Sequence, residues 1–381
     1  MKIRVYADDF KNAIQKIAPV IPKRSALESL KYIRLQANCD DSITLYATDV
    51  ENAVSVTIPG VVLKDGYVDV HFDDLKKITN IKDDVVITST SVDDATGTIE
   101  FRSAKKTYTV TSRYFENIHT FTDCKFTSCV EIPESIMADL KPLAIMASAN
   151  EADGMMTSLF FDMENGRIIT LDGHRIGIQN MDTSVAESFM APAKIVPIMK
   201  SLIGKTENDT IKVEIGEKTI RYTGYRFVCW QRRLEGQYYN VQNILKTSKE
   251  NYKSAFTVGN KEISEIAKEY KKVLTADEKK PMIITESHGV ICTGIRLQTY
   301  QTSDALETAN IKYHSGDFFV GLNPSFILDA ATFIKGDMEF RINSYKSPVY
   351  IRSEDGKKEC VILPVNIGST GLVEFVKKQA C

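Results

Sequence analysis

Residues 5–21, VYADDFKNAIQKIAPVI, set a pattern that occurs three times in the chain. A short run typical of a β-strand leads into a segment whose apolar residues recur at the spacing of an amphipathic helix. The stretches 130–147 (VEIPESIMADLKPLAIMA) and 256–274 (FTVGNKEISEIAKEYKKVL) open in the same way. Self-similarity of this kind predicts a repeated structural unit.

Each copy continues with a second strand-then-helix segment and then a pair of alternating strands. The second segments lie at 67–80, 189–204 and 318–336, and the strand pairs at 98–112, 219–233 and 338–353. Alternation of apolar and polar residues predicts half-buried antiparallel strands. We therefore expect an α+β fold of three repeated domains, each with two helices packed on antiparallel sheets. Their expected bounds are 1–126, 127–253 and 254–367, followed by an extension at 368–381. The alternative is three unrelated α+β stretches that are alike by chance.

The composition is that of a soluble globular protein. The 381 residues are 43% hydrophobic and 26% charged, with a net charge of −2. No apolar run is long enough to span a membrane, and the N-terminus lacks a secretory signal. Seven cysteines occur without a CxxC pair, which favours reduced thiols in the cytoplasm.

Motifs for catalysis, nucleotides and metals are missing. The chain has no P-loop, no dinucleotide-binding glycine motif, no HExxH and no GxSxG, and its five histidines are scattered singly. We expect no enzyme, no catalytic residue, no metal and no cofactor.

The stretch TLDGHRIGIQ at 170–179 nevertheless resembles a fragment of an active site. A catalytic role for Asp172 and His174 needs a nucleophile or metal nearby, and no such motif is present. The structural interpretation is a tight turn at Gly173, with the Asp172 side chain bonded to nearby backbone.

Five segments, taken in order, resemble motifs of the bacterial sliding clamp, the β subunit of the replicative DNA polymerase. They are TLDGHR (170–175), LEGQYYNV (234–241), LNPSFILDA (322–330), SPVYIR (347–352) and CVILPVNI (360–367). The resemblance covers roughly residues 1–367. It implies a head-to-tail homodimer whose six domains form a ring around double-stranded DNA, without reading its sequence. The ring tethers DNA polymerase subunits and repair factors and is opened by a separate clamp loader.

In that family, partners dock a short hydrophobic peptide into a pocket between the second and third domains. The resemblance assigns this pocket to Met156, Leu171, Gly173, His174, Arg175, Ile176, Tyr239, Asn243, Ile244, Asn323, Phe326, Tyr345, Ser347, Val361, Ile362, Leu363, Pro364 and Val365. A mostly apolar set with a few polar groups suits a peptide with two or three hydrophobic anchors. We expect Arg175 and the backbone to orient that peptide.

A sliding ring needs a diffuse positive lining that holds phosphates without reading bases. The helices of the three repeats supply candidate lysines, and a basic loop follows the first helix. The expected DNA-channel residues are Lys11, Lys16, Lys23, Arg24, Lys76, Lys77, Lys194, Lys200, Lys205, Lys261, Lys268, Lys271 and Lys272. For each lysine alone, a solvated helix face is the alternative.

The dimer is expected to pair strand edges of the first and third repeats. The candidates are the runs around Ile78–Asn80 and Thr107–Thr111 on one side, and 268–273 with 296–306 on the other.

Several features depart from the family pattern. Tyr239 and Asn243 stand where Pro and Arg are common, Asn366 replaces a common Arg, and the loop 148–154 is acidic. The extension 368–381 contains an apolar cluster, LVEF, for which we weigh two hypotheses: it fills the peptide pocket, or it is a disordered or helical appendage. Two other functions remain open, an interaction scaffold of the same fold that does not encircle DNA and a hydrolase that uses Asp172 and His174.

Overall fold

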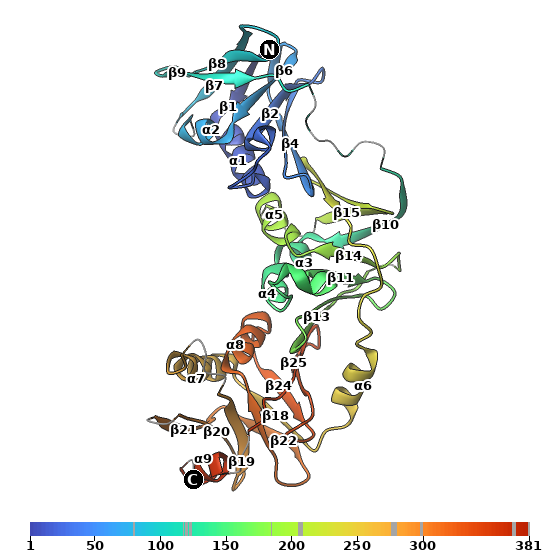
Figure 1. Cartoon of the computed structure of the whole chain (residues 1–381), viewed down its shortest axis with the longest axis vertical. Coiled ribbons are helices and arrows are strands. Elements are labelled where there is room, and N and C mark those ends of the chain that lie inside the picture. The colour runs from blue at the N-terminus through green and yellow to red at the C-terminus, as the bar shows by residue number, and fades with distance from the viewer. Residues whose placement is uncertain are drawn as a thin grey trace. The chain divides into compact units, whose positions relative to one another are not determined.

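The computed structural model describes two compact α+β units. The described residues are 1–78, 81–116, 118, 121, 124–183, 185–204, 209–275, 280–297, 300–367 and 371–379. The first unit consists of Met1–Asp139 with Thr183–Glu235, and the second of Leu140–Asp182 with Gly236–Cys381 (Figure 1). Among the described residues, no helix is both long and apolar enough to cross a bilayer.

The predicted repeat is present in the order of the elements. The three openings are β1 (Lys2–Tyr6) with α1 (Ala7–Ile17), β10 (Phe126–Pro133) with α3 (Glu134–Ala138), and β18 (Ser254–Val258) with α7 (Asn260–Lys272). The second segments are β6 (Gly66–His71) with α2 (Phe72–Ile78), β14 (Phe189–Pro192) with α5 (Ile195–Leu202), and β23 (Phe319–Leu322) with α8 (Pro324–Phe333). The strand pairs are β8 (Thr96–Arg102) with β9 (Thr107–Arg113), β16 (Thr219–Gly224) with β17 (Phe227–Arg232), and β24 (Met338–Ile342) with β25 (Val349–Ser353).

The middle repeat differs from the expected single helix. Its helical segment divides into α3 and α4 (Leu140–Ala144), because Asp139 leaves the helical conformation at φ −100° and ψ 17°. Pro142 has no N–H and cannot donate the helical hydrogen bond back to the carbonyl of Ala138. The sequence therefore favours two short helices over one long helix at this point.

In the first unit, one antiparallel sheet joins two of the repeats. Its order is β10-β15-β16-β17-β4-β3-β2-β6-β9-β8-β7-β1-β5. The strands not yet bounded are β2 (Tyr32–Ala37), β3 (Ser42–Thr48), β4 (Asn52–Pro59), β5 (Val61–Lys64), β7 (Asp84–Ser91) and β15 (Thr210–Gly216), and the short helices are η1 (Ala18–Val20) and η2 (Glu28–Lys31). β4 pairs with β17 from Val56↔Phe227 to Asn52↔Gln231, so the first repeat continues directly into the second.

The second unit joins repeats in the same way. Its larger sheet contains, in order, β11 (Ser158–Asp162), β12 (Arg167–Leu171), β13 (Arg175–Asn180), β26 (Lys358–Ile362), β25, β24, β18 and β22 (Asn310–His314). Its smaller sheet has the order β21 (Gln301–Ala305), β20 (Val290–Arg296), β19 (Met282–Ser287) and β23. The pairing of β13 with β26 joins the second repeat to the third. η3 (Glu151–Thr157) and α6 (Gln242–Glu250) complete the elements before the extension.

These two pairings explain why the chain forms two units although its pattern repeats three times. Part of the middle repeat lies in each unit, in a sheet shared with a terminal repeat. The domain bounds 1–126, 127–253 and 254–367 remain a prediction.

The C-terminal extension forms helix α9 (Gly371–Gln379), which packs against the smaller sheet of the second unit. Val373 and Val376 of α9 are buried against Ile283 and Cys292. Gly294 of β20 lies directly beneath the helix, since a Cβ at that position would come within 2.5 Å of a methyl group of Val376. The hypothesis that LVEF fills the peptide pocket is therefore wrong, and the helical appendage is confirmed.

The strand register places α9 and α7 on opposite faces of this sheet. Ile283 lies opposite Gly294 on the face that α9 covers. Thr293, the next residue to Gly294, lies opposite Asp304, which accepts a hydrogen bond of 2.5 Å from Tyr270 of α7. Successive residues of a strand point to opposite faces, so α9 covers the face of the sheet that α7 does not. Solvent would otherwise reach this apolar surface.

Two strand edges that the sequence marks for a dimer lie free in the described pairings. β21 is the edge strand of the smaller sheet. β9 pairs with β8 along its whole length, but β6 pairs with β9 only at Ser112 and Arg113. Thr107–Thr111 therefore keeps one unpaired edge, as does β21. Of the Ile78–Asn80 run, only Ile78 falls within the described residues.

We expect Val376→Ala to lower the free energy of unfolding of the second unit by about 1–2 kcal/mol, because it removes two buried methyl groups. Glu374→Ala, on the exposed side of the same helix, is the control and should stay within about 0.5 kcal/mol. Urea unfolding followed by circular dichroism measures both. Equal stability of the two variants would show that α9 does not hold to the sheet in solution.

Candidate functional site

The DGHR motif forms the turn between β12 and β13. Gly173 adopts a φ of 82°, in the region that favours glycine. Oδ1 of Asp172 accepts hydrogen bonds of 3.0 Å from the backbone N–H groups of His174 and Arg175. The structural interpretation of this stretch is confirmed, because the Asp172 side chain closes the turn.

Arg175 is buried below the turn, with only 8% of its surface exposed. Its Nε donates to Oδ2 of Asp172 at 2.9 Å, and its two terminal nitrogens donate to Asp329 of α8 and, at 2.9 Å, to the carbonyl of Ile145. The guanidinium also lies 4.6 Å from the ring centroid of Phe326. Arg175 thus holds the hairpin, α8 and the end of α4 together.

The expectation that Arg175 orients a bound peptide stays a prediction, and the fold gives Arg175 a structural role besides. All three guanidinium nitrogens already donate within the protein, and the group is buried. This arrangement also leaves Asp172 no part in activating His174, because both carboxylate oxygens are engaged by the turn and by Arg175. The His174 ring instead stacks on Phe326, with 6.1 Å between ring centroids.

Exposed apolar groups lie beside the turn and after β24. His174 and Leu363 lie side by side, because the Leu363 N–H donates to the carbonyl of His174 at 2.8 Å. Leu363 is 36% exposed and Tyr345 is 42% exposed. Tyr345 stacks on Phe319, a residue that also packs against α9. These side chains can contact a hydrophobic peptide without rearrangement of the core.

Four of the predicted pocket residues are instead part of the core. Leu171, Ile176, Val361 and Ile362 are each less than 9% exposed. Ile176 pairs with Val361, and Arg175 with Ile362, across β13 and β26. They can support a peptide pocket only from below, and their place in such a pocket stays a prediction.

Cys360 and Tyr238 are buried near this surface. Burial raises the pKa of the Cys360 thiol well above its usual range, and its Sγ lies 3.9 Å from Sδ of Met146. Burial also raises the pKa of Tyr238, whose ring stacks on Phe160 at 4.7 Å. Both groups stay neutral at physiological pH, which suits a structural role.

The remaining predicted pocket residues lie on separate elements of the second unit. Asn323 caps α8, because its Oδ1 accepts from the Ser325 N–H at 2.9 Å, and Ser347 shares a hydrogen bond of 2.8 Å with Ser344. Asn243 and Ile244 lie on α6, which packs on β24 and β25. The others are Met156 on η3, the half-exposed Tyr239, and Pro364 and Val365 after β26.

The predicted DNA-channel lysines produce a weaker local positive potential than their number in the sequence suggests. Several pair with carboxylates: Lys11 with Asp8 at 3.4 Å, Lys76 with Asp73 at 2.6 Å, Lys77 with Asp74 at 2.8 Å, and Lys194 with Glu51 at 3.3 Å. For Lys11, Lys76 and Lys77 the acid stands three residues earlier on the same helix, a signal that is readable in the sequence. Such exposed pairs are weak but reduce the local positive potential.

Most of the other basic candidates are exposed, but Lys16 is half-buried. Lys200 lies on α5 without an acid on that helix, and Lys261, Lys268, Lys271 and Lys272 lie on α7. Lys205 lies outside the described residues. Lys23 and Lys76 share a hollow of about 210 Å³ with Lys31, which the sequence analysis did not select. Arg24 is exposed in the loop beside that hollow.

We expect Arg175→Met to lower the unfolding free energy by about 3–5 kcal/mol, because it leaves the carboxylates of Asp172 and Asp329 without their cation. Arg102→Met is the control, since Arg102 is 64% exposed and should change stability by less than about 0.5 kcal/mol. Chemical denaturation measures both. Similar values for the two variants would contradict the role of Arg175 in holding the hairpin, α8 and the end of α4 together.

Known proteins resemble this chain along nearly its whole length. No family model matches it. It is 20% identical to the beta sliding clamp of Haemophilus influenzae over 393 residues, covering 96% of this chain and 100% of the relative.

Solved structures share its fold. A DNA polymerase III beta subunit from Eubacterium rectale superposes with a TM-score of 0.86 at 19% identity, covering 97% of this chain and 100% of the other. A sliding clamp from Bartonella birtlesii bound to griselimycin gives a TM-score of 0.84 at 19% identity, covering 96% and 100%. The resemblance that the sequence motifs indicate is confirmed, and the chain has the fold of the bacterial β sliding clamps.

Proposed function

We propose that the protein is a DNA sliding clamp that encircles duplex DNA as a homodimeric ring and tethers polymerase subunits and repair factors. The observation that carries this proposal is the similarity to sliding clamps over 96–97% of the chain, which includes all three repeats. In this proposal the protein acts as a tether and not as a catalyst.

The free edges support a ring. An unpaired strand edge exposes a row of backbone donors and acceptors that a second chain can complete. β9 over Thr107–Thr111 offers such an edge in the first unit, and β21 offers one in the second. Two different edges on one chain permit head-to-tail pairing, which closes into a ring after two copies if the rotation allows.

The charge distribution supports topological rather than tight binding. The helices α1 and α2 each carry two acids and two lysines, and α7 carries four lysines against three glutamates. Weak phosphate contacts of this kind are lost steeply as salt rises. A closed ring stays on DNA without them, and it slides because no contact is strong.

The decisive experiment loads labelled protein onto nicked circular DNA with a working clamp loader and then washes at high salt. We expect the protein to remain on the intact circle and to leave when the circle is cut once. Loss during the wash, with a loader shown to be active on that DNA, would contradict encirclement.

Loss of the protein from the circle during the high-salt wash would favour the second candidate, a clamp-fold scaffold that does not encircle DNA. The near-neutral helices and the acidic loop at 148–154 support this alternative. Its mass in solution separates the two: a single chain at all concentrations fits the scaffold, and two chains fit the ring.

We expect the exposed surface around the turn to bind partner peptides. Leu363→Ala should weaken the binding of a short hydrophobic clamp-binding peptide about tenfold or more, since apolar anchors of an interface carry most of its energy. Tyr313→Ala, at a residue 50% exposed on β22, is the control and should change affinity less than twofold. Fluorescence anisotropy of a labelled peptide measures both, and equal affinities would place the peptide site elsewhere.

A further inference from the structure

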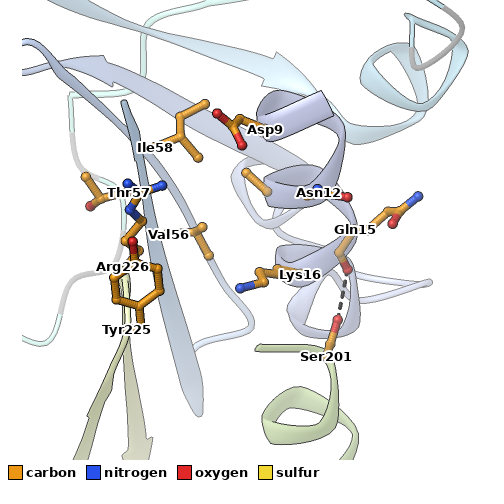
Figure 2. Close-up of a pocket in the computed structure, with 11 residues that line it drawn as sticks. Asp9, Asn12, Gln15, Lys16, Val56, Thr57, Ile58, Ser201, Tyr225 and Arg226 are labelled. Atoms are coloured by element: carbon orange, nitrogen blue, oxygen red, sulfur yellow. Dashed lines mark hydrogen bonds between the residues drawn. The ribbon is translucent and has the colours of Figure 1, made fainter. Parts of the chain in front are cut away.

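A cavity of about 330 Å³ lies in the first unit, where the first and second repeats meet (Figure 2). It is lined from four segments: α1, the end of β4, α5 and the turn between β16 and β17. None of the sequence motifs accounts for it. Its walls carry two cationic side chains, Lys16 and Arg226.

Hydrogen bonds fix these segments around the cavity. The Thr57 N–H of β4 donates to the carbonyl of Arg226 at 2.9 Å, which ties the turn to β4. The Ser201 hydroxyl of α5 donates to the carbonyl of Gln15 at 3.0 Å, which ties α5 to α1 (Figure 2). The cavity is therefore built by the joint between the two repeats and is not a gap in a mobile loop.

The backbone of Arg226 adopts a φ of 59°, a conformation in which glycine or asparagine is usual. A long cationic side chain is present at this position in spite of the strain. Its guanidinium lies 5.0 Å from the ring centroid of Tyr225, an aromatic residue that is 65% exposed at the cavity.

Lys16 faces the cavity rather than open solvent. Its side chain extends from α1 toward β4 and the Tyr225–Arg226 turn (Figure 2). Burial lowers the pKa of its ammonium, the carboxylate of Glu134 opposes this shift, and the positive charge of Arg226 adds to it. Among the described residues, neither Lys16 nor Arg226 forms an ion pair.

Asp9 is the acidic group that lines the cavity. It lies beside Ile58, at the other end of α1's cavity face from Lys16 (Figure 2). Asn12 also lines the wall, and its amide can donate to a ligand oxygen, whereas the Gln15 side chain extends from α1 away from β4 (Figure 2). Two cations that form no ion pair among the described residues, Lys16 and Arg226, line the same space, so an anion with several oxygens satisfies more of their donors than water does.

We infer that this cavity binds a phosphate group, held by the Lys16 ammonium and the Arg226 guanidinium. A guanidinium offers a planar fork of donors to phosphate oxygens, and an ammonium offers a compact charge. The phosphate comes either from a free phosphorylated molecule or from the DNA backbone. The inference does not depend on the proposed function, because binding needs neither a ring nor a loader.

Calorimetric titration with inorganic phosphate at constant ionic strength tests the site directly. We expect measurable binding that Lys16→Gln weakens about tenfold or more, since each charge-assisted contact contributes strongly. Lys11→Gln is the matched control, because Lys11 lies on the same helix, pairs with Asp8 and does not line the cavity. It should change phosphate affinity less than twofold.

Arg226→Asn is the second variant, chosen because asparagine tolerates the left-handed backbone and keeps the turn folded. Arg226→Asn should weaken the binding of phosphate as Lys16→Gln does. No phosphate binding by the unaltered protein would overturn the inference, and so would equal binding by the Lys16 and Lys11 variants.

A linear duplex oligonucleotide then identifies the source of the phosphate. If the duplex displaces inorganic phosphate and Lys16→Gln weakens duplex binding, the DNA backbone supplies the group. If the duplex does not compete, the ligand is a free phosphorylated molecule. Either result supports the phosphate site. If the phosphate site fails these tests, the expected retention of the protein on circular DNA is unaffected.

Discussion

Two antiparallel strand pairings hold the repeats of this protein together, and the functional surfaces depend on both. β4 pairs with β17 in the first unit, and β13 pairs with β26 in the second. Each pairing joins an edge strand of one repeat to an edge strand of the next, so that no edge remains open between them. The cavity at Lys16 lies beside the first pairing, and the exposed surface at His174 lies beside the second.

The second pairing is reinforced by a buried ionic cluster. Arg175 is the first residue of β13, and its guanidinium donates hydrogen bonds to the turn before it, to α8 and to the end of α4. Breaking a buried pair costs far more than an exposed one, because the partner is left as a bare charge. Arg175 therefore helps to fix where His174, Phe326 and Leu363 stand.

The order of the elements could be predicted from the sequence because the three openings share one hydrophobic period. The segments Thr107–Thr111 and β21 have an unpaired edge among the described residues, and their pairing in a dimer stays a prediction. Burial was harder to predict: Val361 and Ile362 have the right composition for a peptide pocket but belong to a strand covered on both faces.

Other features depend on contacts that no local pattern records. The structural role of Arg175 depends on the three-dimensional position of Asp329, 154 residues further along the chain. The packing of α9 depends on Gly294, a residue distant in sequence whose missing side chain lets Val376 approach the sheet. The cavity at Lys16 arises where four separate segments meet, so no single motif could indicate it.

The central claim is that β9 of one chain meets β21 of another to close a ring. Its most direct measurement is cross-linking across that joint, with cysteines introduced at Thr109 and Ser303 and a flexible bis-maleimide. Cys39, Cys124, Cys129 and Cys381 are replaced by serine to remove background. The account predicts a doubly bridged dimer that stays on circular DNA even in denaturant, once loaded. Monomers, or an open ladder of larger species, would contradict it.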